Sequence, residues 1–297
     1  TYWSEGAAKL YGWSADEAVG RHAHSLLATE FAASPEQPMA RIAALRSVAR
    51  LQPPERWRRA SPLLADPIRA VRLEAVSTLA EGPPPGAPEA ERAAFDRAAA
   101  EYVAAERFNA DRAESRTNLG NFFSRRGDAV AAEEEYRAAI ALAPLVAPRI
   151  ALADLYRATG READAERLLR ATVMIDPQAA APRHALGLAL VRQKKYAEAL
   201  DLLKQAAERE PGQPRYAYVY AIALQSTGRN DEAMDVLRRA AEANPSDRSI
   251  LSTLLQNSLR AGQFDAALDY AQKLSALSPD DAGLKRIVEQ LGGQGKK

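Results

Sequence analysis

The stretch "NLGNFFSRRGDAVAAEEEYRAAIALAP", residues 118–144, decides the fold of this chain. Its large apolar side chains fall at helical spacing before and after Gly127, and the stretch closes with Pro144. A glycine in that place suits a tight turn that needs a positive φ. The stretch therefore predicts two helices that meet at residue 127.

The same unit recurs along the chain. The closing prolines follow one another at spacings of 33, 34, 34 and 34 residues: Pro144, Pro177, Pro211, Pro245 and Pro279. Seventeen residues before each proline, the turn position is occupied by Gly127, Gly160, Lys194, Gly228 and Gly262. Five residues after the turn comes a small side chain: Ala132, Ala165, Ala199, Ala233 and Ala267. This periodicity is typical of a helix-turn-helix solenoid, in which stacked units bury one continuous core.

These residues resemble the tetratricopeptide repeat (TPR) family, whose pattern is a Leu-Gly pair, an aromatic, a turn, an alanine, an aromatic, an alanine and a closing proline. The stretch at 118–144 matches almost throughout, and "ALGLALVRQKKYAEALDLLKQAAEREP", residues 185–211, matches nearly as well. The resemblance covers about residues 113–281 in five units. It implies an all-α fold, a right-handed α-solenoid, and a non-catalytic scaffold for protein–protein interaction.

In that family the first helix of each unit lines a concave groove, and the resemblance predicts which residues face it. They are Asn118, Asn121, Arg125, Asp154, Arg157, His184, Leu188, Arg192, Arg215, Tyr218, Ile222, Gln225, Gln256 and Arg260. The amides can hydrogen-bond to the backbone of an extended peptide, the arginines can bind its carboxylates, and Tyr218 and Ile222 can contact its apolar side chains. The family's carboxylate clamp for chaperone tails matches at Asn121. However, it requires basic residues where this chain has Thr117, Ala181 and Ala185, so chaperone tails are not predicted partners.

The ends of the array depart from the pattern. The last unit has Leu255 in the small-residue place and Ser258 in the aromatic place. Residues 282–297 are predicted to form a capping helix, "AGLKRIVEQL", followed by the flexible tail "GGQGKK". Ahead of the five units, residues 89–112 carry apolar side chains at the spacing of a second repeat helix, which predicts a half-repeat capping helix.

Residues 36–82 resemble a pair of HEAT repeats, because "ARIAALRSVA" at 40–49 aligns with "VRLEAVSTLA" at 71–80. Asp66-Pro67 is predicted to open the second of these helices, with the proline in its first turn. The proline-rich stretch 83–88 is predicted to be a stiff, extended linker. A cluster of arginines near the pair is interpreted as a solvated basic surface: Arg41, Arg46, Arg50, Arg56, Arg58 and Arg59.

Residues 1–35 begin with "TYWSEGAAKLYGWSADEAVG", which resembles the early part of a PAS sensory domain. Such a domain needs about a hundred residues, and this segment would supply one strand and two short helices. The alternative is an N-terminal helical cap in which Ser14 and Glu17 form a capping box. The order of the helical segments is similar to the C-terminal region of some bacterial multihaem c-type cytochromes, although this chain has no haem-binding motif.

Several classes of chemistry find no support in the sequence. The balance of 40 Lys+Arg against 39 Asp+Glu gives no electrostatic reason to expect nucleic acid. There is no cysteine, and His22 and His24 lack a nearby third ligand, so no metal or cofactor is predicted.

No apolar run approaches the ~20 residues of a membrane span, so no membrane insertion is predicted. No nucleotide-binding or hydrolase motif occurs, which predicts a protein that is not an enzyme.

The leading hypothesis is therefore a scaffold that binds a peptide or partner protein in its groove. One alternative is a regulatory or sensory chain with a remnant PAS input segment. Another is an accessory part of a multihaem electron-transfer system. The start at Thr1 suggests an internal point of a longer chain, and the sequence leaves open both the oligomeric state and a cytoplasmic or periplasmic location.

Overall fold

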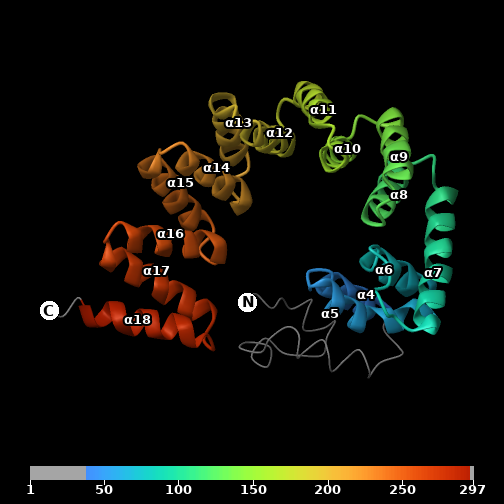
Figure 1. The fold of residues 1–297 in the computed structure, drawn as a ribbon, viewed down its shortest axis with the longest axis horizontal. Helices are drawn as coiled ribbons and strands as arrows, with labels where there is room; N and C mark the ends of the chain where they lie inside the picture. The colour runs from blue at the N-terminus through green and yellow to red at the C-terminus, as the bar shows by residue number, and fades with distance from the viewer. Residues whose placement is uncertain (1–37, 295–297) are drawn as a thin grey trace. The chain divides into compact units, whose positions relative to one another are not determined.

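A computed structural model describes residues 38–294, and every regular element in that range is helical. The helices are labelled in Figure 1 and divide into two compact units between Pro148 and Arg149. The predicted all-α fold of helix-turn-helix repeats is confirmed. The predictions for residues 1–35, including the PAS-like segment, the capping box and His22 and His24, lie outside the described residues.

Among the described residues, unit 1 contains six α-helices and a short 3₁₀ helix. They are α4 (Pro38–Val48), α5 (Pro53–Ala60), η1 (Ser61–Ala65), α6 (Arg69–Thr78), α7 (Glu89–Phe108), α8 (Ala113–Arg125) and α9 (Ala129–Leu142). One apolar core runs from Ile42 to Phe122, so it joins the segment ahead of the repeats to the first repeat. Within it the rings of Trp57 and Phe95 lie 5.9 Å apart.

Unit 2 consists of successive helix pairs and a final single helix (Figure 1). They are α10 (Val146–Ala158), whose first residues precede the division, α11 (Glu162–Ile175), α12 (Ala180–Arg192), α13 (Tyr196–Arg209), α14 (Pro214–Ser226), α15 (Asn230–Ala243), α16 (Arg248–Arg260), α17 (Phe264–Leu277) and α18 (Ala282–Gln294). Each pair packs on the next, and leucines and alanines fill the space between them.

The turns inside the repeats have the predicted backbone. Gly127, Gly160, Gly228 and Gly262 all have positive φ, between 68° and 80°. In the third repeat Lys194 takes the same place with φ 60°. The following residue, Lys195, donates its N–H to Leu190 O at 2.9 Å. A hydrogen bond that reaches back five residues is typical of the end of a helix before a left-handed residue. The geometry of the turn is therefore kept even where glycine is absent.

Small residues occupy the places where the helices of one repeat approach each other. The five repeat alanines are at most 1% exposed: Ala132, Ala165, Ala199, Ala233 and Ala267. A Cβ atom at Gly120 would lie 2.5 Å from the Tyr136 ring, and one at Gly187 would lie 2.7 Å from Leu203. The glycine of the Leu-Gly pair is thus required by the packing of the second helix on the first.

The C-terminal cap is longer than predicted. Helix α18 continues through Gly292 and Gly293 to Gln294, so the prediction that a loose tail begins at residue 292 is wrong. Leu291 is 7% exposed and belongs to the core that includes Ala271 and Leu274. Because the last turn of α18 is held by this buried leucine, the helical conformation extends over the glycines that follow.

Two predictions for the segment ahead of the repeats are also corrected. Helix α6 begins at Arg69, so Pro67 precedes the helix instead of lying in its first turn. The Asp66 carboxylate accepts the N–H of Ile68 at 2.9 Å, and the residue before a proline is restricted to extended conformations. The stretch at 83–88 is not extended throughout, because Ala87 donates its N–H to Pro84 O at 3.1 Å and its side chain is buried.

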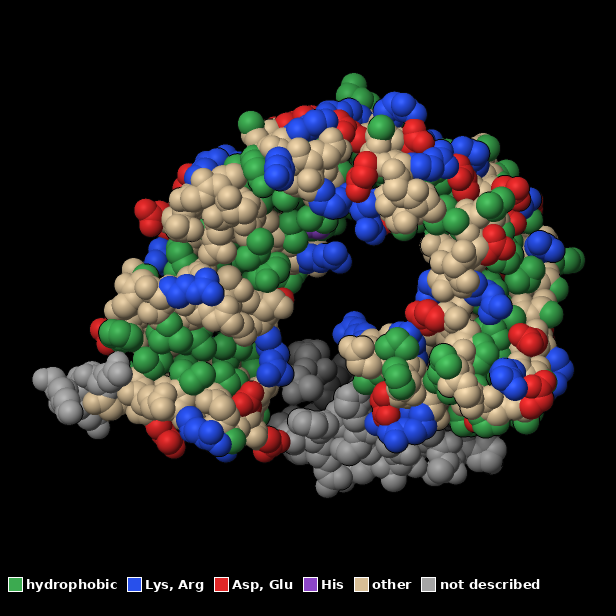
Figure 2. All heavy atoms as spheres, in the orientation of Figure 1, with side chains coloured by type: hydrophobic (Ala, Val, Ile, Leu, Met, Phe, Trp, Pro, Cys, Tyr) green, Lys and Arg blue, Asp and Glu red, His purple; other side chains and the backbone are tan. Residues whose placement is uncertain are grey.

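The predicted basic surface is largely a set of ion pairs. Arg41 and Arg56 are buried, and they pair with Asp66 and Glu81. The more exposed members Arg46, Arg58 and Arg59 pair with Glu74 or Glu55. A buried guanidinium needs a carboxylate or carbonyl partner, so the arginines serve the packing of this region. On the face drawn in Figure 2, basic and acidic side chains are interspersed over each unit.

Candidate peptide-binding faces

The predicted groove residues of unit 1 lie together. Asn118, Asn121 and Arg125 line a cavity of about 340 Å³ on helix α8, facing α6 and α7. The side chain of Asn118 donates to Glu106 Oε1 at 3.1 Å, and Asn121 Oδ1 accepts the hydroxyl of Tyr136 at 2.8 Å. These polar atoms are therefore already engaged within the unit.

Arg125 connects α8 to the end of α6. Its guanidinium donates to Ser77 O at 2.8 Å and to Thr78 O at 3.1 Å, and it pairs with Glu81 Oε1 at 3.0 Å. Three acceptors satisfy most of the donors of one guanidinium. Although Arg125 lines the cavity, its hydrogen bonds hold two helices of the same unit together.

The same cavity contains a phenol with a perturbed pKa. Burial raises the pKa of Tyr102 to about 12, and the negative charge of Glu106 acts in the same direction. Tyr102 thus stays protonated over the whole physiological pH range. Its ring lies 5.0 Å from that of Phe122, which places it in the core as well as in the cavity wall.

In unit 2 the first helices of three successive repeats line one cavity. It has a volume of about 300 Å³ and is formed by α10, α12 and α14, with a contribution from α11. Five of the predicted groove residues line it: Asp154, His184, Leu188, Arg192 and Arg215. The structure thus brings these five predicted residues together, beside other lining residues that the sequence did not predict, such as Leu169 and Tyr216.

His184 is the buried polar group of this cavity. Its side chain is 7% exposed, its ring lies 4.6 Å from that of Tyr216, and neither Nδ1 nor Nε2 has a hydrogen-bond partner among the described residues. Burial, together with the positive charge of Arg215, lowers the pKa of His184 to about 4. At neutral pH the imidazole is uncharged, so one nitrogen is a donor and the other an acceptor.

The charged residues around this cavity differ in their pairing. Arg192 Nε lies 3.4 Å from Glu162 Oε1, and Arg157 Nε lies 3.6 Å from Asp154 Oδ1. Arg215 is exposed, and within residues 38–294 it has no carboxylate partner. Within the described part of the chain, the cavity therefore combines an unpaired cation, an unpaired buried imidazole and apolar walls.

The remaining predicted residues do not line the His184 cavity. Tyr218 is half-buried, Ile222 is 39% exposed, and Gln256 is exposed. Gln225 and Arg260 line a separate polar cavity of about 740 Å³ between the fourth and fifth repeats. The predicted set is thus distributed over several places in unit 2.

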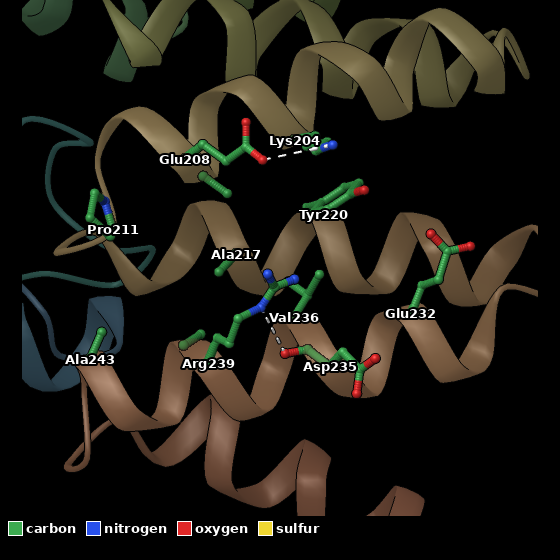
Figure 3. Close-up of a pocket in the computed structure, with 12 residues that line it drawn as sticks. Lys204, Glu208, Pro211, Ala217, Tyr220, Glu232, Asp235, Val236, Arg239 and Ala243 are labelled. Carbon is green, nitrogen blue, oxygen red and sulfur yellow. Dashed lines mark hydrogen bonds and ion pairs between the residues drawn. The ribbon is translucent and has the colours of Figure 1, made fainter.

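A further cavity lies where no binding residue was predicted. It has a volume of about 460 Å³ and is formed by α13, α14 and α15 (Figure 3). Charged side chains of both signs surround the Tyr220 ring, and Lys204 Nζ lies 3.8 Å from Glu208 Oε1. Arg239 donates to Asp235 O at 3.3 Å. Small residues on the second helices, such as Ala207 and Ala243, are the signal that could have located it.

Residues 38–294 also lack the features of two other kinds of function. Nowhere in that range do three or more His, Asp or Glu side chains gather so that they could hold a metal ion. None of the helices in that range combines the length and apolar character needed to traverse a bilayer.

Comparisons with known proteins identify the repeats. A family model described as tetratricopeptide repeat matches residues 190–257, and a second model of the same description matches residues 146–171. The chain therefore contains tetratricopeptide repeats, as the sequence predicted. The same comparisons give no support to the HEAT-like, PAS-like or cytochrome resemblances. No curated protein matches the chain.

Several solved structures are similar in fold. MamA is 21% identical with a TM-score of 0.47, over 56% of this chain and 97% of that chain. YrrB, described as a TPR protein with an unusual peptide-binding site, is 18% identical with a TM-score of 0.44, over 62% and 95%. A thermophilic TPR protein of Thermus thermophilus is 21% identical with a TM-score of 0.44, over 60% and 98%.

Proposed function

We propose that this protein is a non-catalytic scaffold that binds an extended segment of a partner protein along the first helices of its repeats. The observation that carries the proposal is the cavity in unit 2 that α10, α12 and α14 line together. A face shared by consecutive repeats can contact several successive residues of one segment, which is how solenoid proteins generally recognise their partners.

The chemistry of the first helices supports a peptide as ligand. Arg215 has no carboxylate partner among the described residues and is placed to pair with a carboxylate of a ligand, and Tyr218 and Ile222 on α14 offer apolar contact. The charges beside the Tyr220 cavity of the second helices pair with each other or with backbone carbonyls. The first helices therefore offer a ligand an arginine without a carboxylate partner, whereas the charged groups beside the Tyr220 cavity are already paired.

Selection of peptides tests this proposal. The full chain is immobilised, a random peptide library is displayed on phage, and the affinity of an enriched peptide is measured by titration calorimetry. We expect the double variant Arg215→Ala/Tyr218→Ala to weaken binding by about tenfold or more, because two contacts of ~1 kcal/mol are lost.

The matched control is Lys204→Ala/Arg239→Ala, which removes two exposed charges beside the Tyr220 cavity of the second helices and should leave the affinity unchanged. Circular dichroism establishes that both variants are folded. The proposal is wrong if the library yields no binder, or if the control variant weakens binding while the first-helix variant does not.

A further inference from the structure

The first and second helices of the repeats in unit 2 carry opposite net charges. The second helices α11, α13, α15 and α17 hold twelve acidic and seven basic side chains. The first helices α10, α12, α14 and α16 hold one aspartate, no glutamate, no lysine and seven arginines: Arg149, Arg157, Arg183, Arg192, Arg215, Arg248 and Arg260. The formal charges are therefore −5 and +6. Because the two sets alternate along the chain, both signs appear across the unit in Figure 2.

The seven arginines differ in whether a ligand could use them. Arg183 is 6% exposed and donates to Gln205 Oε1 at 2.9 Å, so it belongs to the packing of the unit. Arg157 and Arg192 are exposed and lie 3.6 Å and 3.4 Å from carboxylate oxygens. Three exposed arginines have no carboxylate partner within residues 38–294: Arg215, Arg248 and Arg260. The positive charge of the first helices is thus only partly compensated.

Two of the uncompensated arginines lie at separate cavities of the first helices. Arg215 is the second residue of α14 and lines the His184 cavity. Arg260 is the last residue of α16 and lines the polar cavity that also contains Gln225 and Asn257. A helix of this length measures about 20 Å, so opposite ends of neighbouring first helices are too far apart for one carboxylate to reach both. A ligand that uses both arginines therefore needs at least two acidic groups.

Apolar side chains accompany these charges. Leu188 lines the His184 cavity, Tyr218 is half-buried, and Ile222 is 39% exposed on α14. A nucleic acid presents a phosphate at every step and would bring some of them close to the acidic second helices. A peptide can place carboxylates only where the arginines are and apolar side chains in between. The combination therefore favours a peptide over a polyanion with uniform charge.

We propose that the bound segment is acidic, with two or more aspartate or glutamate side chains separated by apolar residues, and that Arg215 and Arg260 each pair with one of its carboxylates. Guanidinium groups bind carboxylates through paired hydrogen bonds, which adds geometric selectivity to the attraction of the charges. The negative second helices repel the same segment, so charge also selects the face that it binds. This inference rests on the proposed function, since it names the chemistry of the segment.

The test measures the binding of fluorescently labelled peptides to the full chain by anisotropy. The acidic probe is Glu-Ser-Leu repeated four times with an amidated C-terminus, so that all its carboxylates are in side chains. Two peptides of the same length carry glutamine or lysine in place of glutamate. In about 50 mM salt we expect the acidic probe to bind about tenfold more tightly than the glutamine peptide and the lysine peptide not to bind. This preference should shrink in about 500 mM salt, because exposed charges are then screened.

Variants assign the effect to particular arginines. Arg215→Gln/Arg260→Gln should weaken the acidic probe about tenfold and leave the glutamine peptide unchanged. The matched control, Arg167→Gln/Arg239→Gln, removes two exposed arginines from the second helices and should change the affinity by less than about twofold. The proposal is overturned if the glutamine or lysine peptide binds as tightly as the acidic probe, or if the control variant weakens the probe as much.

Other occupants of the face would appear in the same experiment. A single-stranded oligonucleotide that displaces the acidic probe with higher affinity would assign the face to a phosphate backbone and overturn the proposal. Sedimentation of the chain alone at low salt tests for a second copy. If the chain self-associates and Arg215→Gln/Arg260→Gln abolishes the association, acidic second helices of another copy occupy the face, and the proposal is also overturned.

The failure of this inference differs from the failure of the proposed function. If peptides selected from the library depend on the first helices but are not enriched in aspartate and glutamate, the function stands and the acidic segment is wrong. If the selected peptides depend on the second helices and the acidic probe does not bind, both are wrong. Enrichment of acidic peptides whose affinity falls in Arg215→Gln/Arg260→Gln is the result that we expect.

Discussion

The residues on the first helices of the repeats have equivalent positions in unit 1 and unit 2, but they differ in whether their polar groups have partners. In unit 1, Asn118, Asn121 and Arg125 are bonded to side chains and carbonyls of their own unit. In unit 2, His184 has no hydrogen-bond partner and Arg215 has no carboxylate partner among the described residues. A position in the repeat therefore determines which face a residue joins, while the neighbouring helices determine whether it is available to a ligand.

The largest difference between the units should appear when the Leu-Gly pair is changed. Gly120→Ala forces a Cβ to within 2.5 Å of the Tyr136 ring, whereas Gly187→Ala meets the Leu203 side chain at 2.7 Å. Both contacts are buried, but the Tyr136 ring meets the new methyl group at a shorter distance and is held in place by its hydrogen bond to Asn121. We expect Gly120→Ala to destabilise by about 3 kcal/mol and Gly187→Ala by about 1 kcal/mol, partly offset in both by helix propensity. Urea unfolding midpoints measure both, and a greater loss for Gly187→Ala would contradict the account.

Substitution of Arg125 and of Arg215 should change the stability of the chain to different extents. Arg125→Ala removes a guanidinium that bonds to Ser77 O, Thr78 O and Glu81, and it should destabilise by about 2 kcal/mol. Arg215→Ala removes an exposed side chain and should change stability by less than about 0.5 kcal/mol. Thermal unfolding of the two variants is the measurement. Equal losses would mean that Arg215 has a structural partner after all.

Acid should weaken an ion-pair network in unit 2. Burial opposes ionisation of Glu166, but hydrogen bonds from Arg170, Gln193 and Lys195 outweigh it and lower the pKa to about 2. Because the folded-state pKa lies below the ordinary 4.5, the stabilisation is complete above pH 4.5 and is lost as the pH falls toward 2. Glu166→Gln should be less stable than the wild-type chain at neutral pH, with a difference that shrinks in this window. A difference independent of pH would exclude the network as its cause.

The smallest expected effect concerns the one repeat turn without glycine. Lys194 has φ 60°, a region that an L residue enters with strain. Lys194→Gly removes that strain and adds backbone entropy to the unfolded chain, so the net gain should be about 0.5 kcal/mol. The control is Lys195→Gly, at the neighbouring position, which should be destabilising. Precise calorimetry separates the two, and a loss of stability in Lys194→Gly would show that the turn is not strained.

The periodicity of the sequence was sufficient to predict the helix-turn-helix repeat. The turn glycines, the buried alanines and the helix pairs all follow from side-chain size and backbone freedom, which are properties of single residues. The pattern also brought Asp154, His184 and Arg215 to one face, where they line one cavity.

Other features depended on contacts that no local pattern encodes. Leu291 packs the last turn of α18 against the core, and Asp66 accepts the N–H of Ile68 just before α6 begins. The buried guanidinium groups of Arg41 and Arg56 form ion pairs with carboxylates. The burial of His184 depends on Tyr216, which comes from the next repeat. The Tyr220 cavity was not predicted, because the repeat resemblance assigns the groove to the first helices and this cavity lies largely on the second helices α13 and α15.

Hydrogen–deuterium exchange of the full chain, with and without a library-selected peptide, determines which helices form the binding face. The account predicts that the peptide slows exchange in α10, α12 and α14, where the first helices share the His184 cavity. Protection confined to α13 and α15, beside the Tyr220 cavity, would contradict the claim that the first helices form the binding face.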